Sequence, residues 1–324
     1  MSVLVTGGLG YIGRFCVRSL RDAGWDVVAV DRRPPEAGPA LETPTITADV
    51  ADSDRIEAVL RAHHVDVVLH LAGDKSVAES MTRPGPLLRN NVGGALGLLE
   101  AMVAAGVKRL VFSSSAAVYG TPERLPIDEA APLRPENPYG ASKAMIEDTL
   151  RWYAACHQVD SLSLRYFNAA GAATDGSLGE DPGRAVNLVP RVMDALAGRS
   201  GPLQVFGTDF PTPDGTAIRD YVHVEDIAAG HLRAIEHVLR TRGADAINIG
   251  TGRGWSVREV LAAAGAATGR PVPFEEAPRR RGDPAAVWAD TAKAVQVLGW
   301  SAARSLDDIM RTAWEWEMRG ARPA

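Results

Sequence analysis

Short apolar runs alternate with stretches of helical periodicity through the first half of the chain. The apolar runs are rich in β-branched residues and occupy residues 2–6, 26–30, 45–48, 66–71 and 109–112. Such runs are typical of parallel strands that are buried on both faces. Helical patterns separate them, over 14–23, 53–62 and a long stretch that ends at Ala105. This alternation predicts an α/β fold built on a doubly wound parallel sheet.

The alternation weakens after Gly171. Loops are expected over 174–184 and 209–215, which are rich in polar residues, glycine and proline. The remaining pattern predicts strands at 203–206 and 246–250, and helices at 186–197, 222–239, from Ser256 onwards and at 305–318. Asp226 is expected to cap the helix at 222–239, and His223 to be packed or hydrogen bonded.

These segments predict a second, smaller α/β lobe whose parts are interleaved with the first domain. The first domain is expected to comprise residues 1–172, with returns near 217–250. The lobe is expected to comprise residues 173–216 and 251–320. The chain's 324 residues suit this division.

A glycine-rich loop follows the first predicted strand directly and leads into the first predicted helix. Its spacing is G-x-x-G-x-x-G, which lets the backbone turn sharply and approach a pyrophosphate at the helix N-terminus. The second strand ends in Asp31, whose carboxylate can bind an adenosine ribose. This order predicts a Rossmann-type dinucleotide-binding domain, with loop contacts from Gly7, Gly10, Tyr11, Ile12 and Gly13.

Two arginines after the second strand bear on the choice of dinucleotide. An arginine at this position can hold the extra phosphate of NADP. Asp31 would repel that phosphate, so NAD is the expected cofactor. Arg32 and Arg33 are then expected to lie in a solvated loop.

Further ligand contacts are expected where the other parallel strands end, because ligands bind at that edge of such sheets. The candidates are Asp49, Val50, Ala72, Gly73, Lys75 and the serine cluster that begins at Ser113. The histidines His63, His64 and His70 lack metal-ligand spacing and are expected to be structural. No metal site is expected.

A tyrosine and a lysine stand four residues apart after the helix-start signal Asn137-Pro138. On a helix this spacing puts Tyr139 and Lys143 on one face. A phenol titrates near ~10 in water, and a neighbouring cation favours the phenolate. The pair is therefore a candidate general base near neutral pH. The same spacing also suits a partly buried ring beside a solvated lysine.

Composition excludes some classes of protein. The hydrophobic content of 46%, the charged content of 23% and the net charge of -5 are those of a globular protein without a dominant nucleic-acid surface. No apolar stretch approaches the ~20 residues that a membrane span needs. Cys16 and Cys156 are far apart and are expected to pack as small hydrophobes in helices. We expect a cytoplasmic enzyme that binds neither nucleic acid nor membrane.

Together, the motifs resemble the extended short-chain dehydrogenase/reductase superfamily, and within it the UDP-glucose 4-epimerases. The superfamily's order is followed by Thr6–Gly13, Leu71–Val77, Asn90–Val92, Ser113–Gly120 and Asn137–Lys143. Segments closer to the epimerases are Arg165–Ala172, Asp214–Val224, Arg279–Asp283 and Trp288–Asp290. The resemblance covers residues 2 to 318, and it implies an NAD-dependent enzyme that inverts C4 of a UDP-hexose.

The resemblance also implies roles for individual residues. Tyr139 would be the acid/base group, Lys143 its electrostatic partner on the nicotinamide ribose, and Ser115 a proton relay from the sugar hydroxyl. The cofactor side would include Leu71, Asn91, Ser113 and Phe167. The nucleotide-sugar would be held by Asn168 and Asn187, its diphosphate by Arg219 and Arg280, and its uridine ribose by Asp283. A homodimer is also implied.

Two positions depart from many relatives. Ala117 replaces a threonine, which removes one hydroxyl near the substrate. Val287 stands where many bacterial relatives carry tyrosine and where relatives that accept N-acetylated sugars carry a smaller residue. We therefore hypothesise that UDP-GlcNAc and UDP-GalNAc are accepted as well.

Other functions are weighed against this one. A nucleotide-sugar 4,6-dehydratase needs an acid pair after the serine strand, where this chain has Ala116 and Ala117. An epimerase of a UDP-pentose or UDP-uronate stays open. A non-catalytic NAD-binding regulator shares the fold but has no need for the set Ser115, Tyr139 and Lys143.

Overall fold

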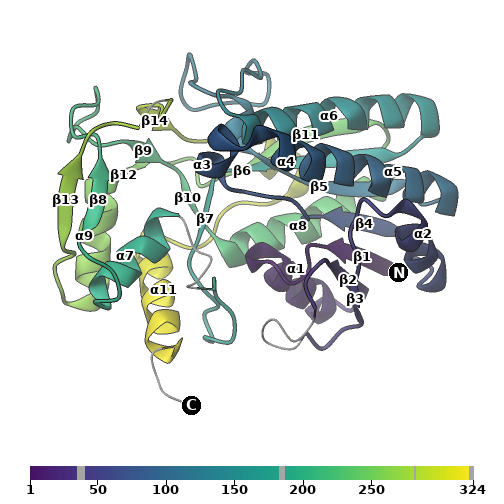
Figure 1. The fold of residues 1–324 in the computed structure, drawn as a ribbon, viewed down its shortest axis with the longest axis horizontal. Helices are drawn as coiled ribbons and strands as arrows, with labels where there is room; N and C mark the ends of the chain where they lie inside the picture. The colour runs from purple at the N-terminus through teal and green to yellow at the C-terminus, as the bar shows by residue number, and fades with distance from the viewer. Residues whose placement is uncertain (35–40, 182–186, 281, 321–324) are drawn as a thin grey trace.

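The computed structural model describes residues 1–34, 41–181, 187–280 and 282–320, and within these a parallel sheet of seven strands forms the centre of the molecule. Its order is β3-β2-β1-β4-β5-β6-β11 (Figure 1). The strands are β1 (Ser2–Thr6), β2 (Asp26–Asp31), β3 (Thr45–Thr47), β4 (Val67–His70), β5 (Arg109–Ser115), β6 (Asp160–Tyr166) and β11 (Ala244–Ile249). The predicted doubly wound sheet is confirmed.

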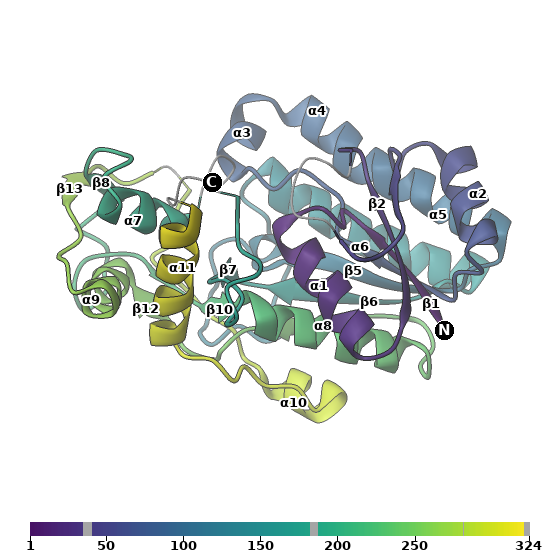
Figure 2. The same cartoon turned by 90° about the horizontal axis from the view of Figure 1, so that it is seen from below.

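Helices cover both faces of this sheet (Figures 1 and 2). One face is covered by α1 (Tyr11–Asp22) and α8 (Val224–Val238), and the other by α2 (Ser53–Ala62), α5 (Gly94–Ala105) and α6 (Pro138–His157). Phe15 and Ile227 are buried on the first side, and Leu98 and Ile146 on the second. The central strands β1, β2 and β4 are mostly apolar because helices cover both of their faces.

Short segments join these layers. The connection from β4 to α5 contains α3 (Val77–Thr82), α4 (Pro84–Leu88) and one π-helical turn, Arg89–Gly93. A 3₁₀ turn, Ala116–Val118, follows β5, and α10 (Ala292–Leu298) packs beside α8 and β11. Asn137 caps α6, since its side-chain oxygen accepts the Gly140 N–H at 2.8 Å, as the helix-start signal predicts.

A smaller lobe lies at the carboxyl ends of the strands (Figure 1). Its helices are α7 (Leu188–Leu196), α9 (Val257–Thr268) and α11 (Leu306–Gly320), which pack with the parallel pair β8 (Leu203–Phe206) and β13 (Phe274–Ala277). Ser256 and Glu259 form the predicted capping box of α9. The predicted helix start at 186 lies outside the described residues.

Short strands connect the lobe to the main sheet. β7 (Asn168–Ala170) pairs with β10 (Tyr221–His223), and β9 (Ile218–Arg219) lies between β12 (Trp255–Ser256) and β14 (Ala286–Val287). These strands are two or three residues long. A period of two residues cannot be recognised over so short a run, which is why the sequence pattern did not predict them.

Among the boundaries that differ from the prediction, three lie near the cleft or the lobe. β5 continues to Ser115, so the serines belong to the strand and not to a loop after it. α1 begins at Tyr11, directly after the glycines. α8 begins at Val224, because residues 221–223 form β10.

The predicted helix cap at Asp226 is wrong. His223 caps α8, since its ring Nδ1 accepts the Glu225 N–H at 3.2 Å, while its Nε2 lies 3.2 Å from Thr312 Oγ1. The buried carboxylate of Asp226 instead accepts the backbone N–H groups of Ala303 and Arg304. Asp226 therefore forms hydrogen bonds with a distant segment of the chain and not the local capping bond that the sequence suggested. The expectation that His223 is packed and hydrogen bonded is confirmed.

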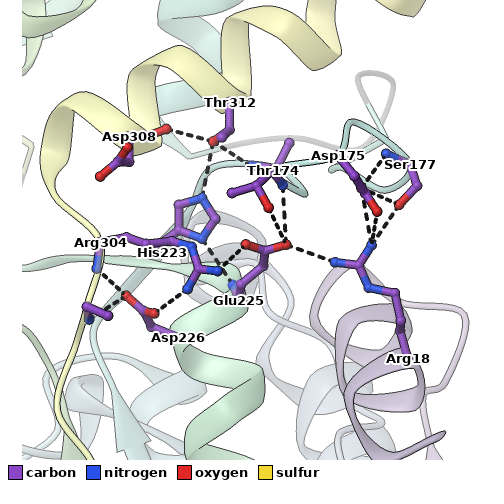
Figure 3. A network of polar contacts seen from close by, with 12 residues as sticks. Arg18, Thr174, Asp175, Ser177, His223, Glu225, Asp226, Arg304, Asp308 and Thr312 are labelled. Carbon is purple, nitrogen blue, oxygen red and sulfur yellow. Dashed lines mark hydrogen bonds and ion pairs between the residues drawn. The ribbon is translucent and has the colours of Figure 1, made fainter. Parts of the chain in front are cut away.

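Charged side chains around the N-terminus of α8 tie the lobe to the main domain (Figure 3). Glu225 pairs with Arg18 of α1 at 2.9 Å and with Arg304 at 2.6 Å. Arg304 also pairs with Asp226 at 2.6 Å, and it stands just before α11. The position of α11 is therefore fixed relative to α1 and α8.

The two cysteines differ in their surroundings. Both are free thiols; Cys16 is buried in α1, but Cys156 is exposed on α6, so the expectation that both pack as small hydrophobes is wrong for Cys156. Over the described part of the chain, no helix is long and apolar enough to cross a membrane. Nor do the described side chains include a cluster of histidine, cysteine and acid groups that could hold a metal.

Asp226→Ala tests the connection between α8 and the segment before α11. Two backbone N–H groups and the Arg304 guanidinium would lose their acceptor, so we expect the free energy of unfolding to fall by about 2–4 kcal/mol. Urea denaturation measures this change. The control is Asp148→Ala, which removes an exposed ion pair with Arg151 and should cost less than about 1 kcal/mol. Equal losses in the two variants would contradict the role of Asp226.

Candidate active site

A cleft of about 830 Å³ opens at the carboxyl ends of the main strands, between the sheet and the lobe. Most residues predicted to bind a cofactor or substrate line it. On the predicted cofactor side these are Gly7, Gly10, Tyr11, Ile12, Gly13, Asp31, Asp49, Val50, Leu71, Ala72, Gly73, Lys75, Ser113, Tyr139, Lys143 and Phe167. On the predicted substrate side they are Ser115, Asn168, Asn187, Arg219, Asp283 and Val287.

The glycine loop is packed so closely that side chains are excluded. A Cβ at Gly13 would lie 2.1 Å from the Gly7 carbonyl oxygen. Gly7 has φ +71°, and its Cβ would lie 2.8 Å from the Ala72 nitrogen. The loop therefore presents bare backbone to the cleft at the start of α1, which fits the pyrophosphate of a dinucleotide.

Asp31 is buried at the end of β2 and closes one end of the cleft. Its carboxylate accepts the Leu9 N–H at 3.1 Å, which fixes the glycine loop. Arg33 folds back onto the same carboxylate, with Nε 3.1 Å from Oδ1, and Arg32 pairs with Asp74 at 3.0 Å. The expected solvated loop is confirmed for Arg32, whose side chain is 58% exposed, whereas Arg33 is largely shielded by its contact with Asp31. Each already has a carboxylate partner, so their presence is no argument for NADP.

The loop after β4 is held by a residue behind the cleft. Asn91 is buried and does not line the cleft; its Oδ1 accepts the Asp74 N–H at 2.7 Å, and its Nδ2 donates to Ser142 Oγ at 3.1 Å. It therefore positions the loop against α6. In the same loop, the Lys75 ammonium pairs with Glu180 across the cleft at 2.6 Å.

The tyrosine–lysine pair and the serine cluster meet as predicted. Tyr139 and Lys143 lie on the first two turns of α6, which packs against the end of β5. Lys143 is 5% exposed, donates from Nζ to the Ser113 carbonyl oxygen at 2.8 Å, and lies 4.9 Å from the Phe112 ring centroid. The Ser115 hydroxyl is hydrogen bonded to the Tyr139 phenol.

Burial shifts both titrating groups towards their neutral forms. It raises the pKa of Tyr139, and the hydrogen bond from Ser115 opposes this shift. It lowers the pKa of Lys143 to about 8, and the nearby Glu147 carboxylate opposes that shift. The expected lowering of the Tyr139 pKa by Lys143 is not found in the protein alone, where burial raises this pKa and Ser115 opposes the rise. A phenolate here needs further positive charge.

Some lining residues were not singled out from the sequence. The Tyr166 phenol is hydrogen bonded to the Ser113 hydroxyl, and burial raises the pKa of Tyr166. No strand was predicted over β6 (Asp160–Tyr166), so the position of Tyr166 at a strand end, where ligands bind, was not recognised from the sequence. Glu180 lies in a segment predicted only as a polar loop, and nothing in the local pattern distinguishes it.

The substrate side contains one ion pair across the short strands. The Arg219 guanidinium donates to Asp283 at 2.7 Å, so two residues with separate predicted roles are partners here. Val287, in β14 beside Arg219, is buried in one apolar cluster with Phe167. Asn187 precedes α7 but makes no side-chain capping bond, which leaves its amide for a ligand.

Arg280 is placed differently. It does not line the cleft, and its guanidinium stacks on Phe206 at 3.7 Å from the ring centroid. Its predicted contact with a diphosphate stays a prediction. The neighbouring Arg281 lies outside the described residues.

Comparison with known proteins connects this geometry to a family. The model of the NAD dependent epimerase/dehydratase family matches residues 3–250. The UDP-glucose 4-epimerase of Bacillus subtilis is 44% identical, over 98% of this chain and 97% of its own length.

Two solved structures are similar over nearly the whole chain. The UDP-glucose 4-epimerase of Stenotrophomonas maltophila, with bound NAD and formylated UDP-arabinopyranose, has a TM-score of 0.95 at 40% identity and covers 100% of both chains. The UDP-Glc/GlcNAc 4-epimerase of Campylobacter jejuni has a TM-score of 0.83 at 31% identity, over 98% of this chain and 99% of that one. With its glycine loop, its serine–tyrosine–lysine cluster and these similarities, the chain belongs to the NAD dependent epimerase/dehydratase family, within its group of UDP-glucose 4-epimerases.

Proposed function

We propose that this protein inverts C4 of UDP-hexoses, interconverting UDP-glucose and UDP-galactose through a transient 4-keto sugar. The observation that carries the proposal is the meeting of Ser115, Tyr139 and Lys143 in one cleft between a dinucleotide-type glycine loop and the Arg219–Asp283 pair. Residues 1–172, with returns near 217–250, would bind NAD. Residues 173–216 and 251–320 would hold the UDP-sugar. The reaction belongs to galactose metabolism, and we place it in the cytoplasm, where NAD and UDP-sugars are available.

NAD would lie along the cleft from Asp31 to Lys143. The backbone of residues 7–13 would face the pyrophosphate, and the Asp31 carboxylate would bind the adenosine ribose. Lys143 would contact the nicotinamide ribose. When bound, NAD⁺ supplies a hydride acceptor for C4 and a positive ring near the phenol.

The chain's own contribution to the chemistry is proton transfer. Tyr139 Oη would take the C4 hydroxyl proton, directly or through Ser115 Oγ, and would return it after the sugar has turned. The Lys143 ammonium and the Ser115 hydrogen bond would stabilise the phenolate that forms. Burial makes these interactions stronger than they would be in water, because few water molecules compete for the charges.

The substrate side would hold the nucleotide firmly and the sugar loosely. Arg219 is suited to phosphate oxygens and Asp283 to ribose hydroxyls, since a planar guanidinium and a carboxylate match those groups. Their mutual ion pair would then open as UDP binds. Around C4 the cleft presents Ala116, Ala117 and Val287, which leave the 4-keto sugar room to present its other face. Ala116 and Ala117 also argue against a dehydratase, because they stand where that enzyme needs an acid pair.

The identity of the sugar depends on Val287. A valine is small enough to leave space for an acetamido group beside the sugar ring. The similar Campylobacter jejuni protein is a UDP-Glc/GlcNAc 4-epimerase, which supports this wider substrate range.

A homodimer is the assembly we propose. Apolar side chains are unusually exposed on neighbouring helices: Met81 on α3 at 56%, Leu96 on α5 at 40%, and Met145 and Trp152 on α6 at 49% and 66%. α6 contacts both α3 and α5, so these side chains belong to one side of the molecule. A two-fold axis through this face would bury them against a second copy.

Tyr139→Phe removes the proposed acid/base group and little volume. We expect kcat for UDP-galactose to fall by about 10²–10⁴-fold while UDP-sugar binding is retained. NMR-monitored turnover and calorimetric binding measure the two quantities. Tyr153→Phe, on the same helix but bonded to the surface residue Glu100, is the control and should stay within about twofold. Near-normal turnover by Tyr139→Phe would refute the assignment, and NAD binding without turnover by the wild type would favour a regulator.

Val287→Tyr tests the sugar pocket. Filling the space beside the sugar should lower kcat/KM for UDP-GlcNAc by about tenfold or more and spare UDP-galactose, since only the acetamido group needs that space. The same substitution at the exposed Val295 is the control. Robust UDP-galactose turnover by the wild type without any turnover of UDP-GlcNAc would reject the hypothesis.

Trp152→Glu tests the dimer. A buried, unpaired carboxylate at the centre of the proposed interface should shift the protein to monomers in light scattering coupled to size-exclusion chromatography. Val295→Glu, on α10, should leave the mass unchanged. A wild-type protein that is monomeric at micromolar concentration would show the proposed assembly to be wrong.

A further inference from the structure

The end of β5 is joined to α6 at three successive helical turns. Tyr139 is hydrogen bonded to the Ser115 hydroxyl, and Lys143 donates to the Ser113 carbonyl. One turn further along α6, Glu147 Oε1 accepts from the Ser114 hydroxyl at 2.5 Å. Positions 139, 143 and 147 share one face of the helix. The first two belong to the proposed chemistry, and the third has so far been given no role.

Glu147 is also half of a buried ion pair. Arg165 Nη2 lies 2.5 Å from Glu147 Oε2 and its Nε lies 3.0 Å from Oε1, with the two side chains 5% and 3% exposed. Arg165 stands on β6 directly opposite Ser114 of β5. The carboxylate thus binds two adjacent strands and the catalytic helix at one point.

The network continues away from the cleft. Arg165 Nη1 donates to the Tyr119 hydroxyl at 2.9 Å, and that hydroxyl donates to Asn248 Oδ1 on β11 at 2.7 Å. A buried ion pair is often no more stabilising than an apolar pair of similar size. Stability alone is therefore a weak reason for placing one directly behind the serines of the active site.

The charge of Glu147 acts on a group in the cleft. Titratable groups around Lys143 come from several elements: Tyr139 and Glu147 from α6, His70 from β4, and Tyr166 from β6, which is bonded to Ser113. Burial and the Lys143 charge lower the pKa of His70 to about 3, so His70 is neutral. Glu147 provides the negative charge, and it opposes the effect of burial on Lys143.

We propose that Glu147 is a positioning residue for the reaction: it fixes the serines of β5 against α6 and supplies the negative charge that keeps the Lys143 ammonium protonated in its buried site. This inference rests on the proposed function of the same cleft. Glu147 does not touch the substrate, and it acts through Ser114 and Lys143.

Two variants separate this role from a merely structural one. Glu147→Gln removes the charge and keeps the shape, but it leaves Arg165 buried without its partner and is expected to be less stable. Glu147→Leu combined with Arg165→Met replaces the pair by apolar side chains and is expected to fold, which thermal unfolding and circular dichroism check. Asp148→Asn, its neighbour on the exposed side of α6, is the matched control.

The readouts are the pH profile of kcat and the titration of Lys143 itself. The chain has four lysines, so ¹³C-methylated lysine resonances are few, and Lys143→Met assigns the one in the cleft. Without the Glu147 charge, Lys143 loses its proton at lower pH. We expect its titration and the alkaline limb of kcat to move down together, by about one pH unit in Glu147→Gln and in the same direction in the double variant. At pH 8 kcat should fall about fivefold, since the protonated fraction of Lys143 falls from about one half to about one eleventh.

A folded double variant with the wild-type titration of Lys143 and the wild-type pH profile would overturn the proposal. So would an equal shift in Asp148→Asn. The NMR titration needs no substrate, so it tests the role of Glu147 separately from the proposed function, which the wild type's UDP-galactose turnover decides.

Discussion

The site depends on keeping one ammonium charged although it is almost completely buried. Lys143 is removed from water by the packing of α6 on β5, and burial lowers its pKa to about 8. The surrounding chain compensates with the Ser113 carbonyl at 2.8 Å, the face of the Phe112 ring, and the Glu147 carboxylate one turn along the helix. These compensating groups come from two central strands and the helix that covers them. The packing that forms the main domain therefore also sets the charge of Lys143 in the cleft.

Burial also shifts the pKa of Tyr139. It raises the pKa of the phenol and lowers that of the ammonium, so both groups are pushed towards neutral forms in the protein alone. A phenol that stays protonated until further positive charge is bound nearby suits an enzyme that must not act without its cofactor. Proton removal and hydride acceptance would then become possible in the same complex, and neither would proceed in the empty cleft.

Local sequence features sufficed to propose the residues of the cofactor side, which the structure brings into one cleft, because these residues are nearly consecutive in the chain. The glycine loop, Asp31 and the tyrosine–lysine spacing each depend on neighbours within one strand–helix unit. The polar contacts between distant segments were not predictable in this way. Arg219 with Asp283, Lys75 with Glu180, and Glu147 with Arg165 are 64, 105 and 18 residues apart in the chain, and no local period links them.

The incorrect cap at Asp226 has the same origin, since an acid in the first turn of a helix satisfies the local rule while its actual partners are 77 and 78 residues away. The predicted boundary of a helix was wrong where a short strand directly precedes it, as β10 precedes α8. The resemblance to a family supplied the substrate-side residues, which no pattern of apolar and polar positions could have indicated.

On the proposed substrate side, a firm nucleotide site would adjoin a permissive sugar pocket. Asp220, fully buried between β9 and β10, accepts the Thr251 N–H at 2.9 Å and the Ala289 N–H at 3.2 Å. It thereby joins the chain directly after Arg219 to the segment after Val287 and to Thr251. The backbone of Arg219 is held by this frame, so the proposed binding of a phosphate would require only its side chain to leave Asp283. Val287, on the same rigid frame, offers only a small apolar surface. In the proposed reaction, rotation of the keto sugar would therefore require no movement of the backbone, and the size of the residue at 287 would set which sugars have room to turn.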